Sequence, residues 1–151
     1  MVALAGQSQA TPGAGATGSP LIRGTFTEDV SVKFSLSPGQ RTIISNAKDA
    51  SQVASQTITL GAGGHTGWHS HPGPVVVTVV SGTLTFYDGE GPCLGRTYPA
   101  GTAFVDPGMG HVHIARNEGS GSVEISAVYF GLPPGVGTQR IDAPAPGNCP
   151  F

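Results

Sequence analysis

The alternation of apolar and polar residues predicts a protein built from short β-strands. From residue 21 onward, alternating or β-branched stretches are separated by turn-forming residues, a pattern typical of strands. The expected strands cover residues 22–26, 30–36, 42–44, 56–60, 75–80, 83–87, 102–105, 112–116 and 123–130. Residues 47–55 are expected to form one helical turn or a loop, and the apolar run 75–80 suits a strand covered on both faces. The pattern therefore predicts an all-β fold.

The two ends of the chain have a different composition from the middle. Residues 1–20 are mainly Ala, Gly, Ser, Thr and Pro, which predicts a disordered leader. They lack the basic start and apolar run of a complete signal peptide, although their small residues resemble the end of one. A trimmed secretion signal and a low-complexity leader of a cytoplasmic protein both stay open. From about residue 132 the chain is Pro-rich, so we expect one domain over 21–151 that ends in an irregular tail.

Length and charge narrow the class of protein. A chain of 151 residues suits a single domain, and 24 Gly and 13 Pro favour many short strands separated by turns. The net charge is −2 and only 7 residues are basic, so the sequence lacks the excess of positive charge that is typical of nucleic-acid-binding proteins. No stretch reaches the roughly 20 apolar residues that cross a membrane. We therefore expect neither a nucleic-acid partner nor a membrane partner.

The two cysteines suggest a disulfide. Neither Cys93 nor Cys149 has metal-ligand spacing to the other or to a histidine. Cys149 lies in the Pro-rich tail, where a covalent tether would explain its presence. We predict a Cys93–Cys149 disulfide that pins the tail over the domain, with two free thiols as the alternative. A disulfide implies an oxidising compartment and so favours a secreted or periplasmic location over a cytoplasmic one.

All five histidines lie in two short runs, at residues 65–71 and 111–113. Alternate side chains of an extended strand share a face, so His69 and His71 can point the same way, whereas Trp68 is expected on the other face. Neutral imidazoles on one face, joined by a third from elsewhere, make a site for a borderline transition metal. The alternative is a set of solvated histidines on a polar strand. Their clustering beside Gly-rich turns favours the metal site.

The spacing around these histidines resembles the two sequence motifs of the cupin superfamily. The residues that match the two motifs are Gly63, His69, His71 and Gly82 in the first, and Gly101, Pro107, His113 and Asn117 in the second. The second motif carries one extra residue between Pro107 and Gly110. The resemblance covers roughly residues 55–130 and is closest in kind to small single-domain bacterial cupins. It implies a jelly-roll β-barrel that holds one divalent metal through His69, His71 and His113.

One departure from the cupin pattern concerns the fourth ligand. The glutamate that usually completes the metal site falls on Val75, and the neighbouring Val76 carries no carboxylate either. The resemblance therefore implies three neutral histidine ligands. His65 or His111 could add a fourth nitrogen, although we expect His65 at the barrel mouth and His111 in a supporting or surface position. The metal, whether Fe, Mn, Ni, Cu or Zn, stays open.

The resemblance implies an enzyme that acts on a small organic molecule. Three neutral imidazoles leave a divalent ion its full charge, so an anionic molecule is expected. Oxygen-dependent cleavage, an oxidoreductase reaction, is expected ahead of lyase or isomerase chemistry. The competing class is a non-catalytic module that binds a metal or a small ligand, because cupins host many functions. Cupins often dimerise, so a homodimer is one assembly to expect, and the oligomeric state stays open.

Overall fold

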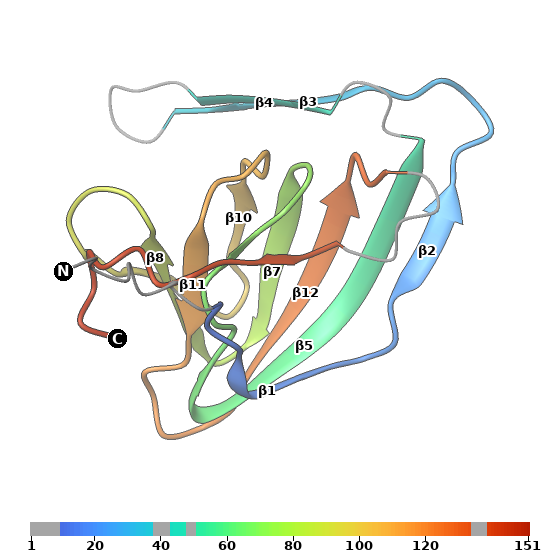
Figure 1. The fold of residues 1–151 in the computed structure, drawn as a ribbon. Helices are drawn as coiled ribbons and strands as arrows, with labels where there is room; N and C mark the ends of the chain where they lie inside the picture. Colours follow the sequence, from blue (N-terminus) through green and yellow to red (C-terminus); the bar gives the residue numbers. More distant parts are fainter. Residues whose placement is uncertain (1–9, 38–42, 48–50, 134–138) are drawn as a thin grey trace, which may run out of the picture.

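Antiparallel strands make up the regular structure of this chain in its computed structural model (Figure 1). The structure describes residues 10–37, 43–47, 51–133 and 139–151. The strands are β1 (Ala14–Gly18), β2 (Ile22–Thr25), β3 (Val32–Leu36), β4 (Ile43–Ala47), β5 (Gln52–His65), β6 (His69–Ser70), β7 (Val75–Ser81), β8 (Thr83–Asp88), β9 (Arg96–Pro99), β10 (Ala103–Asp106), β11 (His113–Arg116), β12 (Val123–Phe130) and β13 (Ile141–Asp142). Within the described residues no helix is long and apolar enough to cross a membrane. The all-β prediction is confirmed.

One eleven-stranded sheet curls into a nearly closed barrel. β12 pairs with β5 on one side and with β7 on the other, and β10 continues the sheet beyond β7. A second group consists of β11 with β6 and β8, and β9 pairs with β8. The end of β5 joins the two groups, because His65 pairs with Arg116 of β11. This arrangement confirms the cupin-type jelly roll.

The alternation along the central strands places the core inside the barrel. In β12 the residues Val123, Ile125, Ala127 and Tyr129 are buried, and the residues between them are half-buried. β7 alternates in the same way, and Val80 is 51% exposed. The expectation that 75–80 is covered on both faces is therefore wrong. Each buried valine contributes about 1.5–3 kcal/mol, which accounts for the inward face of β7 without a functional role.

The N-terminal segment is more ordered than its composition suggests. β1 and β2 both pair with β5, so the expectation of disorder over 1–20 is wrong for residues 10–20, while residues 1–9 lie outside the described part of the chain. The small residues of this segment allow its backbone to lie very close to the backbone of the neighbouring segment. A Cβ on Gly13 would lie 2.9 Å from the carbonyl oxygen of Thr66. The expected turn or loop at 47–55 is also wrong for residues 52–55, which belong to β5.

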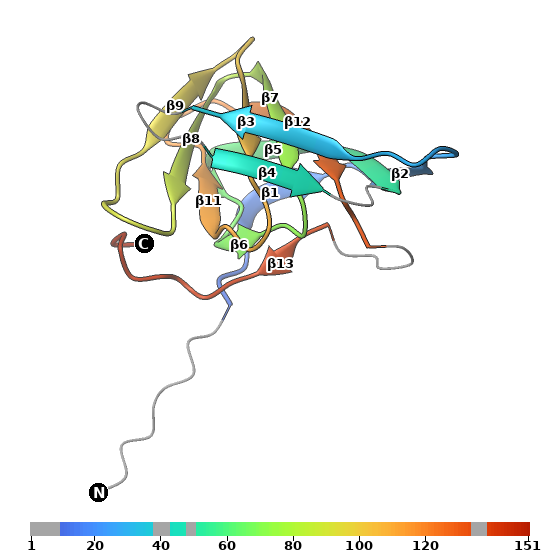
Figure 2. The same cartoon turned by 90° about the horizontal axis from the view of Figure 1, so that it is seen from above.

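The C-terminal tail packs on the outside of the barrel. The predicted Cys93–Cys149 disulfide is present, with the two Cα atoms 5.1 Å apart. Trp68 lies on the face opposite the histidines, buried in a small cluster with Ile114, Ala143 and Cys149. Over residues 139–151 the tail is irregular except for a bridge between Pro144 and Ala10 and for β13, which pairs with β6 and lies beside it in Figure 2. The disulfide and the expected position of Trp68 are confirmed.

A separate hairpin, β3–β4, lies across one end of the barrel. Figures 1 and 2 show it above the barrel and crossing that end. It forms its own two-stranded sheet, and the Phe34 ring lies 6.0 Å from the ring of Phe130 on β12. A cleft of about 780 Å³ is lined by Leu36 of the hairpin and by Phe104 and His111 of the barrel. The hairpin thus forms one wall of the cleft that contains His111.

Candidate metal centre

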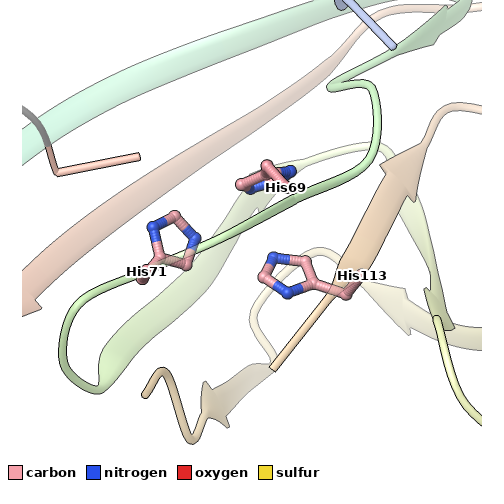
Figure 3. A group of neighbouring side chains, drawn as sticks. All are labelled: His69, His71 and His113. Atoms are coloured by element: carbon pink, nitrogen blue, oxygen red, sulfur yellow. The ribbon is translucent and has the colours of Figure 1, made fainter. Parts of the chain in front are cut away.

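Strand pairing brings the two histidine runs together. His69 opens β6, His71 directly follows this strand, and His113 opens β11, where it is the direct partner of His69. The ring centroids lie 4.8 Å apart for His69 and His71, 4.3 Å for His69 and His113, and 5.2 Å for His71 and His113. One nitrogen from each ring lies within 4.8 Å of those of the other two. Figure 3 shows the three rings around a common space, all of them buried.

Backbone carbonyls fix the orientation of each ring. Nδ1 of His69 lies 2.9 Å from the Gly67 carbonyl oxygen, and Nδ1 of His71 lies 2.7 Å from that of Gln139. Nδ1 of His113 lies 3.2 Å from the carbonyl oxygen of His111. A carbonyl oxygen only accepts, so each Nδ1 must donate a proton. In a neutral ring this leaves the Nε2 lone pair free for a metal, and such outer hydrogen bonds orient metal-binding histidines.

Burial keeps these rings neutral. It lowers the pKa of His71 from its usual 6.5, and lowers the pKa values of His69 and His113 well below that value. Repulsion between neighbouring imidazoles acts in the same direction for His69 and His113. A metal ligand must be unprotonated, so the rings are in the required state at neutral pH.

The space beside the rings is small and mainly apolar. It measures about 40 Å³, and Val75, Phe104 and Tyr129 are among its lining side chains. Val75 lines it, as expected for the position of the missing glutamate. A water molecule needs roughly 10–15 Å³ measured in this way, so the cavity holds an ion and only a few ligand atoms. A large ligand can insert only one end here.

A carboxylate enters this cavity from β10, at a position that the second motif spans but leaves unspecified. Asp106 ends β10 and is the direct partner of Val75 on β7. Directly opposed residues of an antiparallel pair project to the same face, so Asp106 delivers its carboxylate next to the side chain of Val75. Asp106 is only 2% exposed and lines the cavity. Sequence reasoning missed it, and the one available signal was its position at the end of the expected strand 102–105, directly before Pro107.

Asp106 is charged and incompletely paired. Burial alone would raise the pKa of its carboxyl, but the imidazoles of His113 and His111 favour the carboxylate and lower the pKa. Oδ1 accepts a hydrogen bond from Nδ1 of His111 at 2.7 Å and lies 3.6 Å from Nδ1 of His113. Oδ2 is buried without a hydrogen-bond partner among the described residues. An unpaired buried carboxylate oxygen is costly, so it is a candidate to face a ligand or a metal-bound group.

His111 lies beside the three-ring cluster, with its ring centroid 5.7 Å from that of His113. Nε2 of His111 is 2.9 Å from Asp88, and its hydrogen bonds to Asp106 and Asp88 raise the pKa of the ring to about 9. Both nitrogens of the protonated ring donate to carboxylates, so neither offers a lone pair to a metal, although His111 belongs to a second group with Asp106 and His113. Nδ1 of His65 accepts a hydrogen bond from the amide of Gly67.

Solved structures of several proteins overlap part of this barrel. A protein of Klebsiella pneumoniae with a double-stranded β-helix domain is 26% identical over 50% of this chain and 64% of its own, with a TM-score of 0.45. A cupin domain of Bordetella pertussis is 19% identical over 70% of this chain and 97% of its own, with a TM-score of 0.46. An oxalate oxidase in complex with the substrate analogue glycolate is 22% identical over 52% of this chain, with a TM-score of 0.47, and the overlap spans 41% of the oxidase.

No protein-family model matches the sequence, and no curated protein matches it either. The overlaps with solved structures are partial, and the TM-scores quoted lie below 0.5. The jelly-roll barrel therefore rests on this chain's own strand pairing, and the resemblance to cupins rests on its two histidine motifs.

Proposed function

We propose that the protein is a metal-dependent cupin that acts on a small anionic organic molecule. One divalent transition metal would be held by Nε2 of His69, His71 and His113. The observation that carries the proposal is that each of these buried rings uses Nδ1 for a backbone carbonyl, which leaves Nε2 available, and that the three rings offer ligand nitrogens within 4.8 Å of one another. Imidazole nitrogen suits Fe, Ni, Cu and Zn, whereas Mn prefers oxygen ligands, so the three histidines favour the first four metals over Mn. The bound metal would supply Lewis acidity and a template for the ligand.

Local charge supports an anionic ligand. The three imidazoles are neutral and do not offset the charge of the metal. The carboxylate of Asp106 is near, but it belongs to a cluster in which protonated His111 and Arg96 offset the two carboxylates of Asp106 and Asp88. A unit charge about 4 Å from an anion is worth around 4 kcal/mol at an effective dielectric of 20, so the uncompensated part of the metal's charge favours an anion.

The proposed reaction is oxygen-dependent cleavage, with lyase or isomerase chemistry second. Three protein ligands leave coordination positions for a substrate and for a further small molecule, which suits a reaction with two reactants. The second candidate is a non-catalytic module that captures a metal or a small anion. The cavity of about 40 Å³ favours this candidate, because it leaves little room for a substrate to rearrange.

Metal analysis of protein purified without an affinity tag, followed by calorimetry, tests the proposal. We expect one divalent metal per chain and at least tenfold tighter binding of a chelating carboxylic acid than of its amide. Equal affinities for acid and amide would refute the charge argument. Oxygen consumption or product formation with a panel of small carboxylates would support the enzyme. Binding without turnover under each of the five metals would favour the module.

A further inference from the structure

A second cleft adjoins the histidine cavity. It measures about 370 Å³, and Ile58 and Thr66 line both spaces. The cleft also has polar lining from Gln56 and Arg140. Clefts of roughly 300–1,000 Å³ accommodate small organic ligands, whereas the histidine cavity alone does not. A ligand could therefore keep its body in this cleft while one end reaches the histidines.

The backbone on both sides of Arg140 is tied to the segment that carries the histidines. The carbonyl oxygen of Gln139 accepts the hydrogen bond from Nδ1 of His71 at 2.7 Å. On the other side, Asp142 of β13 pairs with His69 of β6. The backbone at Arg140 is thus anchored on both sides to the segment of His69 and His71, which suits a residue that orients a substrate.

The guanidinium of Arg140 has unused donors. Its Nε donates to Oδ1 of Asp142 at 2.6 Å, and no other side-chain hydrogen bond of Arg140 occurs within the described part of the chain. A guanidinium carries five N–H donors, so the two terminal nitrogens remain available. Asp142 is the one carboxylate among the described residues that line the cleft. Its side chain is 52% exposed, so water screens its charge.

The charge of Arg140 also reaches the histidines. Burial is the largest cause that lowers the pKa values of His69 and His71, and the positive charge of Arg140 is a smaller cause that acts in the same direction. In the larger cleft beneath the β3–β4 hairpin, the side chain of Arg96 is 47% exposed, against 29% for Arg140, and two carboxylates, Asp88 and Glu90, line the space. His111 also lines it, but both of its ring nitrogens already face carboxylates. An anion therefore finds its best partner in the 370 Å³ cleft.

We propose that Arg140 anchors a carboxylate of the ligand in this cleft. The substrate class is then a small dicarboxylate, with a metal-chelating acid at one end and a second carboxylate at the other. The planar guanidinium fork matches a carboxylate with two parallel hydrogen bonds, which a lysine cannot reproduce. The inference rests on the proposed function, because the chelating end needs the metal.

Calorimetry with matched probes tests this role of Arg140. The zinc-loaded protein is titrated with 2-oxoglutarate and 2-oxoadipate, which carry a second carboxylate, and with 2-oxopentanoate, which lacks it. The wild type is expected to bind at least one diacid ten times or more tighter than the monoacid. Arg140→Gln should lose this preference while its zinc stoichiometry and monoacid affinity stay unchanged, and Arg140→Lys should recover only part of it. Arg96→Gln, in the other cleft, should behave like the wild type.

The outcomes separate this inference from the proposed function. A wild type that binds no zinc overturns both. A zinc-loaded wild type without a diacid preference overturns the role of Arg140 and leaves the metal centre intact. That role is overturned in the same way if Arg140→Gln keeps the preference, or if Arg96→Gln loses it equally. Circular dichroism of each variant ensures that a loss is measured on folded protein.

Discussion

At the scale of single residues, the pair formed by Asp106 and His111 determines the charge beside the histidines. A buried carboxylate without a partner would take up a proton. Here His111 stands between Asp106 and Asp88, and one ring nitrogen faces each carboxylate at 2.7 and 2.9 Å. The hydrogen bonds keep His111 protonated and Asp106 ionised. The cavity thus gains a carboxylate that belongs to a neutral cluster, because Arg96 pairs with Asp88 and supplies the second positive charge.

The raised pKa of His111 predicts a loss of stability at alkaline pH. Its pKa is about 9 in the folded protein and 6.5 in the unfolded chain, so the protonated form stabilises the fold. This contribution is fully present below pH 6.5 and is lost as the pH rises through 9. We expect the free energy of unfolding to fall by about 3 kcal/mol between roughly pH 6.5 and 9.5, measured by urea denaturation with a chelator present.

Asp88→Asn provides the control for that pH dependence. It removes the more exposed of the two carboxylates that hold His111 and keeps the side-chain shape. The fall in unfolding free energy over the same pH range should then be clearly smaller than in the wild type. An identical fall in both proteins would mean that His111 is not the group that titrates.

At the scale of elements, the disulfide and the tail protect the outer face of the histidine segment. Trp68 lies directly before His69, and its indole nitrogen donates to the carbonyl oxygen of Phe151 at 3.3 Å. The rings of Trp68 and Phe151 stack with centroids 6.4 Å apart. Cys149 anchors this end of the tail to Cys93. The tail therefore packs against the back of the strand that carries two of the proposed ligands.

Reduction of the disulfide should uncover Trp68. Trp68 is the only tryptophan of the chain, so its fluorescence reports on the tail alone. We expect a red-shifted emission and stronger quenching by acrylamide after reduction, and the same in a Cys93→Ser, Cys149→Ser double variant. Loop closure predicts a loss of roughly 4 kcal/mol in the free energy of unfolding. Unchanged emission in both cases would show that the tail stays in place without the bond.

Sequence patterns predicted the elements better than the contacts between them. Each of the nine expected ranges overlaps a strand, because alternation is a local consequence of one buried face. The resemblance to the cupin motifs named His69, His71 and His113 as one group, and the pairing of β6 with β11 brings their rings together. The sequence did not predict Asp106 as a site residue. Its position beside the histidines depends on the register of β10 against β7, which no local pattern encodes. The sequence did not predict β1, because this strand consists of small residues. Such residues allow two backbones to approach closely, but they are also typical of disordered segments.

At the scale of the whole molecule, net charge is a poor guide to the site. The chain carries a formal charge of −2, yet Arg140 and protonated His111 place positive charge near the histidine cavity. The β3–β4 hairpin roofs one cleft, and the segment before β13 lines the other. Access to the histidines is therefore set by parts of the chain that lie outside the two motifs.

The disulfide also supports a proposal about location. We propose that the protein works in an oxidising compartment, secreted or periplasmic, because Cys93 and Cys149 are bonded in the fold. Mass spectrometry after alkylation of freshly extracted, unreduced protein should find no free thiol, and two free thiols would exclude the proposal. The expected homodimer stays a prediction, which sedimentation of the metal-loaded protein can check.

Metal binding by two single-histidine variants tests the central claim most directly. His71→Ala removes a proposed ligand, whereas His65→Ala removes a ring that only accepts a hydrogen bond from the amide of Gly67. A three-histidine centre predicts one zinc per chain in the wild type, a loss of affinity of more than about 100-fold in His71→Ala, and a change below about tenfold in His65→Ala. A His65→Ala protein that loses zinc as completely as His71→Ala, or a wild type that binds none, would contradict the three-histidine centre.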